Sequence, residues 1–248
     1  VSREWAEQRA RQWGPTSSIY LNRVLGEFST TDSDGVIPLE WLEAAHARWD
    51  DLKEAGKLEA VPLTAVAADV ATEEGVDKTI IVSRHGLVLT TVLSLPHVDT
   101  METTGHVKAI IAAKGPKSRN KKTTPIAVID AIGVGTGVVD RLREQKIKVD
   151  AFMGSGKAKY RDRTGELTFL NRRAESWWAL RDLLNPAFGG QVAIPDIPGL
   201  TGDLVAVKWA QTSTGHIKIE DKDEIIKRLG RSPDEGDAVT MAFNARVD

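Results

Sequence analysis

The amino-acid sequence predicts an α/β protein in which helices flank a mixed β-sheet. Residues 63–95 contain three apolar, strand-like segments joined by short connections, which is typical of an antiparallel meander. From residue 100 onward, segments with helical periodicity alternate with short apolar runs, and this alternation indicates further strands with helices packed on the faces of the sheet. With 248 residues, the chain is long enough for one large domain or for a domain with an appendage.

The composition excludes several classes of protein. The chain is 41% hydrophobic and 27% charged, which is ordinary for a soluble globular protein. A formal net charge of −2 excludes a uniformly basic nucleic-acid coat, so a polyanionic partner would have to be bound by local basic patches. The chain has no cysteine, which excludes disulfides, thiolate zinc sites and a cysteine nucleophile, and its five histidines show no metal-ligand spacing.

The sequence shows no signal peptide and no apolar run long enough to span a membrane. We therefore expect a reducing, intracellular compartment. The first residue is Val1 rather than methionine, which suggests a segment of a longer protein.

Residues 1–58 are predicted to form a helical arm. Residues 2–13 have helical composition, and residues 17–28 are typical of a short helix or packed turn. Within residues 40–56, apolar side chains recur at helical spacing. The arm is either a cap on the domain that follows or a linker to another domain.

Residues 59–248 are predicted to form the sheet and its helices. The meander strands are expected at residues 63–70, 77–83 and 87–95. Helices are expected at residues 100–113, 171–184, 221–229 and from Pro233 onward. Weaker signals suggest the return arm of a hairpin at residues 166–170 and short strands at residues 204–210 and 216–219.

The clearest strand signal is the unbroken apolar run of residues 126–129, which is followed at once by Asp130. Such a run predicts a central strand that is covered on both faces. A charged residue at the carboxyl end of a central strand faces the crevice where α/β proteins place their chemistry, although aspartate is also a common turn residue. A further helix is expected from Val138 and a further strand at residues 149–153.

Two glycine-rich segments invite comparison with nucleotide-binding loops. Gly133, Gly135 and Gly137 do not have the dinucleotide-binding spacing, and residues 151–158 lack the first glycine and the hydroxyl residue of a phosphate-binding loop. A Gly-x-Ser-x-Gly nucleophile elbow is also absent from the sequence. A nucleotide-binding module is therefore the least favoured function. The glycines after Asp130 instead predict a tight turn that lets the next helix pack close to the strand end.

Three aspartates lie at the ends of predicted elements and are the candidate catalytic residues: Asp69, Asp130 and Asp237. An unpaired buried carboxylate is costly, so these residues require bound cations or basic partners. Because the chain offers no useful histidine or cysteine ligands, an all-oxygen site for Mg²⁺ or Mn²⁺ is predicted. Paired ions about 3.5–4 Å apart promote phosphodiester hydrolysis. The alternative is that each aspartate is a cap or a salt-bridge partner.

Six segments carry these motifs in order along the chain. Four surround the aspartates: Ala68-Asp69-Val70, Gly75-Val76-Asp77-Lys78-Thr79, Val128-Ile129-Asp130-Ala131-Ile132-Gly133-Val134-Gly135 and Ser232-Pro233-Asp234-Glu235-Gly236-Asp237-Ala238. Two more are Tyr20-Leu21-Asn22-Arg23-Val24-Leu25-Gly26-Glu27-Phe28 and Asn171-Arg172-Arg173-Ala174-Glu175. Their combination resembles the nuclease domain of phage large terminases, and the resemblance covers most of the chain.

The resemblance implies a ribonuclease H-like fold and a metal-dependent endonuclease. Such an enzyme cuts concatemeric viral double-stranded DNA during genome packaging by two-metal hydrolysis with Mg²⁺ or Mn²⁺. By position, the residues that would hold the ions are Asp69, Asp130 and Asp237, with Asp77 and Asp234 as further ligands. Gly236 precedes Asp237 where some relatives have adjacent aspartates, which leaves open whether Asp234 or Glu235 completes the site.

The resemblance also implies partners and a location. The partners are double-stranded DNA, a portal protein, a small terminase subunit and an ATPase domain of the same chain, towards which residues 1–58 would lead. The location is the cytoplasm of the infected host cell, without a membrane. Two alternatives remain open: a packaging module that binds DNA or the portal without cutting, and another ribonuclease H-like nuclease such as a resolvase.

Two basic clusters are the candidate DNA contacts. One contains Lys114, Lys117, Arg119, Lys121 and Lys122, and the other contains Lys157, Lys159, Arg161 and Arg163. Such residues bind phosphates without reading base sequence, and the alternative is a solvated loop. Trp177 and Trp178 invite a base-stacking interpretation, but their helical spacing with Ala174 and Leu180 favours core or docking positions.

Overall fold

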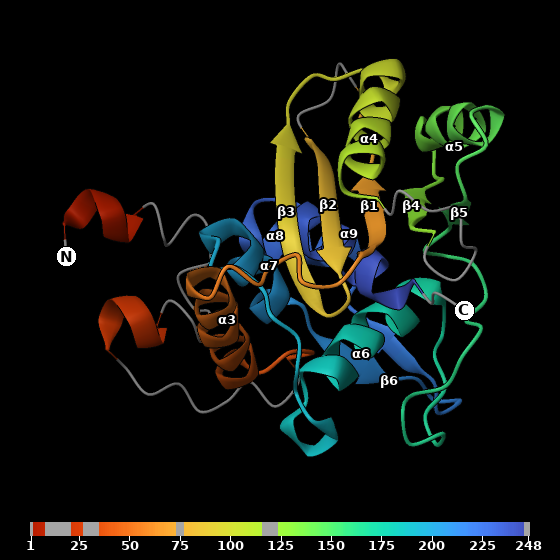
Figure 1. The fold of residues 1–248 in the computed structure, drawn as a ribbon. Helices are drawn as coiled ribbons and strands as arrows, with labels where there is room; N and C mark the ends of the chain where they lie inside the picture. Colours follow the sequence, from red (N-terminus) through yellow and green to blue (C-terminus); the bar gives the residue numbers. More distant parts are fainter. Residues whose placement is uncertain (1, 8–20, 27–34, 73–76, 116–123, 246–248) are drawn as a thin grey trace.

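A five-stranded mixed sheet lies at the centre of the structure, with the strands in the order β3-β2-β1-β4-β5 (Figure 1). The computed structural model describes residues 2–7, 21–26, 35–72, 77–115 and 124–245. The strands are β1 (Leu63–Asp69), β2 (Thr79–His85), β3 (Val88–Leu95), β4 (Ile126–Asp130) and β5 (Val149–Phe152). β1, β2 and β3 pair antiparallel, whereas β4 pairs in parallel with β1 and β5. The predicted mixed sheet with an antiparallel meander is confirmed.

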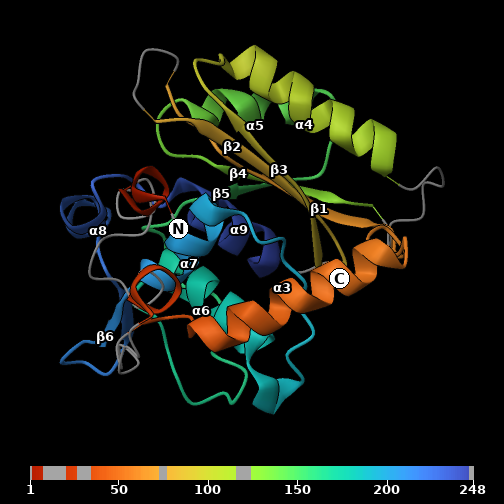
Figure 2. The same ribbon diagram turned by 90° about the vertical axis from the view of Figure 1, so that its left-hand side faces the viewer.

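Helices cover both faces of this sheet, as Figure 2 shows. One face carries α4 (Thr100–Lys114) and α5 (Gly135–Glu144). The other face carries α3 (Leu39–Glu54), α6 (Arg172–Leu184), α7 (Pro198–Ala206) and α9 (Asp234–Asn244). α9 packs directly on β1 and β2, and α6 packs on α9. The layer of helices around α9 therefore brings C-terminal residues to the middle of the sheet.

The remaining elements are short. They are the π-helix η1 (Leu21–Leu25), the 3₁₀-helix η3 (Pro186–Phe188), the paired strands β6 (Trp209–Gln211) and β7 (Ile217–Ile219), and α8 (Lys222–Leu229). None of the described helices is long and apolar enough to cross a membrane.

The apolar run of β4 is buried on both faces, as predicted. Ile126 and Val128 belong to the core cluster that includes α6 and α9, whereas Ala127 and Ile129 belong to the cluster that includes α4 and α5. A strand between two helical layers has no solvent-facing side, so its sequence shows no alternation of polar and apolar residues.

The glycine-rich turn after β4 allows a close approach of α5 to the strand. Gly133 has a φ of 62°, which favours glycine. A Cβ atom at Gly135 would lie 1.8 Å from the carbonyl oxygen of Asp130, so no other residue fits there without a shift of the backbone. The glycines thus have the packing role predicted for them, and α5 begins at Gly135, earlier than the predicted start at Val138.

Two weak strand predictions were wrong. Leu204 to Ala206 belong to α7, which Pro198 starts at its first position, and the pairing strand is confined to β6. In residues 166–170 there is no hairpin arm: Phe169 forms an isolated bridge with Ile217. The Asp162 carboxylate, which accepts from the Leu167 N–H at 2.7 Å, ties this segment into a loop instead.

The N-terminal arm is described in part. Residues 3–7 are helical and η1 lies within the predicted segment 17–28, but residues 8–20 and 27–34 lie outside the described residues.

The predicted helix at residues 40–56 is α3, and it docks on the sheet-bearing body. Leu42 and Ala45 are buried in the core cluster that includes α6 and α9. The indole N–H of Trp49 donates to the Leu89 carbonyl oxygen at 2.8 Å, which ties α3 to β3.

The C-terminal end of α9 is fixed to the sheet by a buried arginine on β2. The Arg84 guanidinium donates to the carbonyl oxygens of Ala242 at 2.7 Å and Ala245 at 2.6 Å, and also to that of Gly86. Burial lowers the pKa of Arg84 to about 10. The contact orients α9, whose other end carries two candidate aspartates.

We expect Arg84→Met to lower the free energy of unfolding by roughly 2–4 kcal/mol, because buried carbonyl oxygens would lose a charged donor. Urea denaturation followed by circular dichroism would measure this loss. Arg143→Met is the matched control, since Arg143 is exposed on α5 and its ion pair with Asp140 spans 3.9 Å; it should change stability by less than about 0.5 kcal/mol. Equal effects of the two substitutions would contradict an anchoring role for Arg84.

Candidate active site

A cavity of about 350 Å³ opens at the carboxyl ends of β1 and β4, and Asp69, Asp130 and Asp237 all line it. In the parallel pair, Ala68 lies opposite Ile129, so the next residues along the two strands, Asp69 and Asp130, are neighbours at one edge of the sheet. Asp237 reaches the same cavity from the first turn of α9. The fold therefore brings together three aspartates that are far apart in the sequence.

A lysine ammonium lies among these carboxylates. Nζ of Lys222, the first residue of α8, is 3.2 Å from Oδ2 of Asp237 and 3.5 Å from Oδ2 of Asp69. It is also 3.6 Å from Oδ1 of Asp234. Burial acts to lower the pKa of Lys222, but the three carboxylates outweigh burial and raise it, so the ammonium stays charged.

Asp237 is held by two donors from α6. The indole N–H of Trp177 donates to its Oδ1 at 2.8 Å, and Nε of Arg173 donates to the same oxygen at 3.0 Å. Arg173 is fixed in turn, because its Nη1 donates to the Glu220 carbonyl oxygen at 2.7 Å. Burial acts to raise the pKa of Asp237, but Arg173 and Lys222 outweigh it and hold that pKa below its usual range. Asp237 is therefore ionised at neutral pH.

The pKa values of Asp69 and Asp130 are shifted in the opposite direction from that of Asp237. Burial raises the pKa of Asp69 to about 7; Lys222 opposes this rise, and the charge of Asp237 adds to it. Burial also raises the pKa of Asp130, although its Oδ1 accepts from the Ile132 N–H at 3.1 Å. Near neutral pH, the site thus holds Asp237 as a charged carboxylate, whereas Asp69 is partly protonated.

The two remaining acidic candidates lie at the edge of this cluster. Asp234 accepts from the Ser232 hydroxyl and lies beside Lys222, but it does not line the cavity. Asp77 is exposed, and its charge adds to the burial that raises the pKa of Asp234. The Glu235 carboxylate lies beside Gly199, and Glu235 does not line the cavity. Of the two residues left open by the sequence, Asp234 is the one next to the lysine.

A buried ion pair positions the first turn of α9. Asp203, which is fully buried on α7, pairs with Arg231 and accepts from the Gly236 N–H at 3.1 Å. A Cβ atom at Gly236 would lie 3.0 Å from Cβ of Asp203 and 3.0 Å from Cη2 of Trp177. The glycine that separates Asp237 from the preceding acidic residues therefore has a packing reason, the close contact of α9 with α6 and α7.

The carboxylate cluster has the donor chemistry of a hard-cation site. It supplies only oxygen ligands, which Mg²⁺ and Mn²⁺ prefer. Oδ2 of Asp237 is buried and accepts no well-directed hydrogen bond; the charge of Lys222 compensates it instead. Among the described residues, no three histidine, aspartate or glutamate side chains have the arrangement of a formed metal site. The residues therefore fit a divalent cation in place of the ammonium that now lies between them.

Comparison with solved structures identifies the fold. The nuclease domain of the large terminase subunit gp2 of bacterial virus Sf6 is similar to this chain with a TM-score of 0.65 and 23% identity, over 85% of this chain and 99% of that domain. Mutant forms of the same domain, with calcium and with manganese, give TM-scores of 0.67 and 0.65 at 22% identity over the same shares. The fold is that of a large terminase nuclease domain. The predicted ribonuclease H-like fold is thereby confirmed. A scan of protein-family models and a search of curated proteins gave no match.

Of the first basic cluster of predicted DNA contacts, the structure describes one residue. Lys114 forms an ion pair with Glu59 at 2.7 Å and donates to the Thr91 hydroxyl at 3.2 Å. Four other predicted DNA contacts lie outside the described residues: Lys117, Arg119, Lys121 and Lys122.

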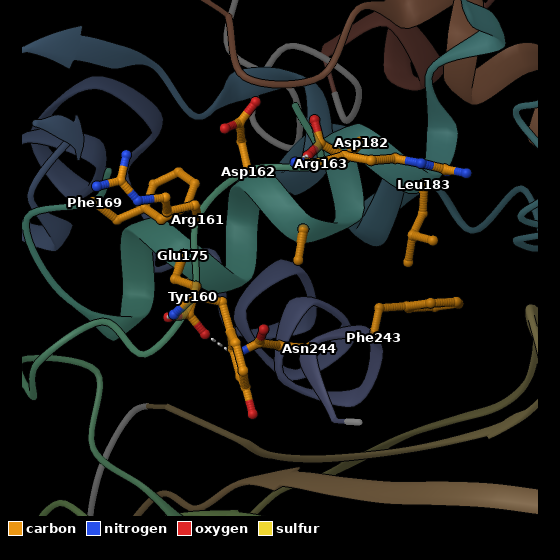
Figure 3. Close-up of a pocket in the computed structure, with 11 residues that line it drawn as sticks. Tyr160, Arg161, Asp162, Arg163, Phe169, Glu175, Asp182, Leu183, Phe243 and Asn244 are labelled. Carbon is orange, nitrogen blue, oxygen red and sulfur yellow. Dashed lines mark hydrogen bonds between the residues drawn. The ribbon is translucent and has the colours of Figure 1, made fainter. Parts of the chain in front are cut away.

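The second basic cluster lies on a loop that α6 holds by its backbone. All four of its basic side chains are exposed: Lys157, Lys159, Arg161 and Arg163. Glu175 accepts from the backbone N–H groups of Lys159 and Tyr160, and Asp182 accepts from that of Arg163 at 2.8 Å. Arg161 and Arg163, with Glu175 and Asp182, line a second cavity, of about 430 Å³, between the loop, α6 and the end of α9 (Figure 3). The loop is thus fixed, and Lys157 and Lys159 are exposed outside this cavity.

Sequence reasoning missed the basic partners of the aspartates. Lys222 lies at the start of an amphipathic helix, and no local signal shows that its ammonium reaches Asp69, 153 residues away. Arg173 lies in a segment that carried part of the family resemblance, which is the one signal that singles it out. The preference for Trp177 as a core residue is confirmed, since it is fully buried, and its indole N–H adds the contact to Asp237.

We expect Asp69→Asn to stabilise the metal-free protein at pH 8 by about 1–4 kcal/mol, but to have little effect near pH 4. The pKa of Asp69 is raised to about 7 in the folded state. The Asp69 carboxyl group therefore adds to the free energy of unfolding below its unfolded pKa, and this contribution is lost as the pH rises through about 7. Denaturation in EDTA between pH 4 and pH 8 would measure this difference. Asp140→Asn on the exposed side of α5 is the control, and a less stable Asp69→Asn variant at pH 8 would show that attraction by Lys222 outweighs burial.

Proposed function

We propose that the protein is a metal-dependent endonuclease that cuts concatemeric viral double-stranded DNA during genome packaging. The observation that carries the proposal is the convergence of Asp69, Asp130 and Asp237 in one cavity at the carboxyl edge of parallel strands. The cavity belongs to a chain with the fold of a large terminase nuclease domain, which adds support from outside the site.

The metal ions would be Mg²⁺ or Mn²⁺, held by Asp69, Asp130 and Asp237, and Asp234, which like Asp237 lies beside Lys222, would be a further ligand. The similar Sf6 domain has been solved with manganese and with calcium. Bound divalent ions in such a site activate water and stabilise the leaving oxygen of a phosphodiester. Asp77 is exposed and would contribute indirectly, because its negative charge helps to raise the pKa of Asp234.

The protein's own groups prepare the site in three ways. Trp177 and Arg173 hold Asp237 in one orientation and keep it ionised. Asp69 and Asp130 lie side by side because their strands are paired in register. Lys222 keeps a positive charge in the cavity, which compensates the carboxylates before a substrate arrives and attracts a phosphate afterwards.

The DNA would be held by the exposed cations of the second basic cluster and by the first cluster around Lys114. We further propose that the chain acts beside an ATPase domain to which residues 1–58 connect, and with a portal protein and a small terminase subunit in the cytoplasm of the infected host cell. These partners follow from the family resemblance of the sequence motifs.

A packaging module that binds DNA without cutting is the second candidate. The observation that favours it is Lys222, whose ammonium occupies the centre of the carboxylate cluster and competes with a cation for the same oxygens. Such a module would retain DNA on a column but would not nick it with any divalent ion. A resolvase-like nuclease of the same fold would instead prefer branched DNA over a linear duplex.

We expect Asp130→Asn to abolish Mn²⁺-dependent nicking of plasmid DNA, with a loss of roughly 100-fold or more, and to leave the fold intact. Asn keeps the acceptor for the Ile132 N–H but removes the charge that a metal ion requires. Agarose-gel assays with Mg²⁺, Mn²⁺ and Ca²⁺ would measure cutting, and circular dichroism would check folding. Asp140→Asn is the control, and undiminished nicking by Asp130→Asn would overturn the assignment.

We expect Lys222→Ala to bind Mn²⁺ roughly tenfold more tightly than the unaltered protein, because it removes a positive charge that lies 3.2 Å from Asp237. Isothermal titration calorimetry would measure the affinity. Lys218→Ala serves as the matched control, since Lys218 pairs with Asp221 at 2.6 Å on the exposed surface. Weaker Mn²⁺ binding by Lys222→Ala would mean that the lysine assembles the carboxylates rather than competing for them.

A further inference from the structure

Exposed apolar side chains gather around the mouth of the carboxylate cavity. In the described part of the chain nine large hydrophobic side chains are exposed, and three of them line this cavity or adjoin a lining residue in the chain: Ile132, Met153 and Leu170. Ile132 lines the cavity, Met153 lies between two residues that line it, and Leu170 precedes another. Single exposed hydrophobic residues are normal, but a group beside a polar recess indicates a partner surface.

The two most exposed members of this group, Ile132 at 56% and Met153 at 53%, are held on rigid backbone. They follow neighbouring strands β4 and β5, and the Ala131 N–H donates to the Phe152 carbonyl oxygen at 2.8 Å, which extends the strand pairing up to them. The Asp130 carboxylate accepts from the N–H of Ile132 itself. We call this pair, Ile132 and Met153, the apolar rim.

The segment that carries Met153 is also tied to α6. The N–H of Arg173 donates to the carbonyl oxygen of Gly154 at 2.9 Å, and that of Arg172 donates to the carbonyl oxygen of Gly156 at 2.8 Å. The rim therefore keeps its place relative to Asp237, which Arg173 also contacts. A preorganised apolar contact of this kind loses little conformational entropy when it binds a partner.

The carboxylates lie below the rim and repel an approaching phosphate. Asp69 is 8% exposed and Asp237 is 7% exposed, so a phosphodiester must enter the recess to reach them. Cations favour its approach from one side, since Lys157 is exposed two residues beyond Ser155, which lines the cavity. To stay in the recess, the phosphodiester also needs a contact that holds its neighbouring nucleotides over the mouth of the cavity.

The side-chain chemistry of the apolar rim determines which groove of duplex DNA it can contact. Isoleucine and methionine have no strong donor or acceptor with which to read the edges of bases in the major groove. They are, however, among the side chains that enter the minor groove and separate base steps. Insertion is easiest at pyrimidine–purine steps, which unstack most readily.

We propose that Ile132 and Met153 enter the minor groove of duplex DNA beside the phosphate to be cut, and that they favour cutting at flexible base steps. The proposal rests on the proposed nuclease function and adds to it a determinant of where the duplex is cut. The rim acts by apolar contact with sugars and base faces, and not by neutralising phosphates.

The test uses the double variant Ile132→Thr/Met153→Gln, in which each side chain keeps a similar size but becomes polar. Val61→Thr and Met101→Gln are matched controls, because both residues are about as exposed and neither they nor their neighbours in the chain line the cavity. Cleavage is measured with Mn²⁺ on a library of duplexes and on bis(4-nitrophenyl) phosphate, a small diester that has no groove. Duplex binding is measured in Ca²⁺ over a range of salt concentrations.

We expect the double variant to lose at least tenfold in kcat/KM on duplex DNA, together with its preference for pyrimidine–purine steps. Hydrolysis of the small diester should stay within twofold of the unaltered protein. Binding should weaken with an unchanged salt slope, because no phosphate contact is removed, whereas Lys157→Ala should reduce the slope by about one.

Unchanged duplex binding and cleavage in the double variant would overturn the proposal and would point to a protein that covers the rim instead. Equal losses on the duplex and on the small diester would also overturn it, because the variant would then have disturbed the carboxylates. If the unaltered protein cut neither substrate, the nuclease function itself would fail. The rim would in that case still be judged by duplex binding in Ca²⁺, where an unweakened double variant contradicts it.

Discussion

The parallel pairing of β1 with β4 is the constraint on which the rest of the site depends. Its register, with Ala68 opposite Ile129, makes Asp69 and Asp130 neighbours at one edge of the sheet. The pair lies in the middle of the sheet because the apolar run of β4 is buried between two helical layers. A slip of one residue would turn every side chain of the strand to the opposite face. The packing of the core and the direction of the carboxylates are therefore set by the same contacts.

Around this edge, residues from separate helices set the charge. Arg173 and Trp177 of α6 keep Asp237 ionised, whereas burial brings the pKa of Asp69 to about 7. Lys222 of α8 lies between these two aspartates and compensates part of their charge. Because buried like charges repel strongly, such a cluster is stabilised by a cation, whether an ammonium or a metal ion, or by protonation of one of its carboxylates. The same contacts that stabilise the free protein thus make its charge depend on pH and set the charge that the proposed metal ions would meet.

The surface around the recess divides into two kinds of contact with different physical roles. The loop that carries Lys157 and Arg161 is held to α6 through its backbone, so its cations are presented outward where they attract phosphates over a long range. Ile132 lines the cavity, Met153 adjoins two lining residues, and both offer only short-range apolar contact. In the proposed nuclease, charge would bring the DNA to this face, and the apolar rim would hold the nucleotides beside the phosphate to be cut.

The sequence by itself determined the strands of the meander, the buried strand that ends at Asp130 and the role of Gly135, because burial on both faces and close packing leave local patterns. It also determined that Asp69, Asp130 and Asp237 stand at the ends of elements. It misassigned residues 204–206, whose burial alternates although they belong to α7, the helix that Pro198 starts. Only the tertiary structure decided that Lys222 meets Asp69 and that Arg173 and Trp177 hold Asp237. Those contacts join residues separated by 60 to 153 positions, and their energies depend on packing across helices, which no local periodicity records.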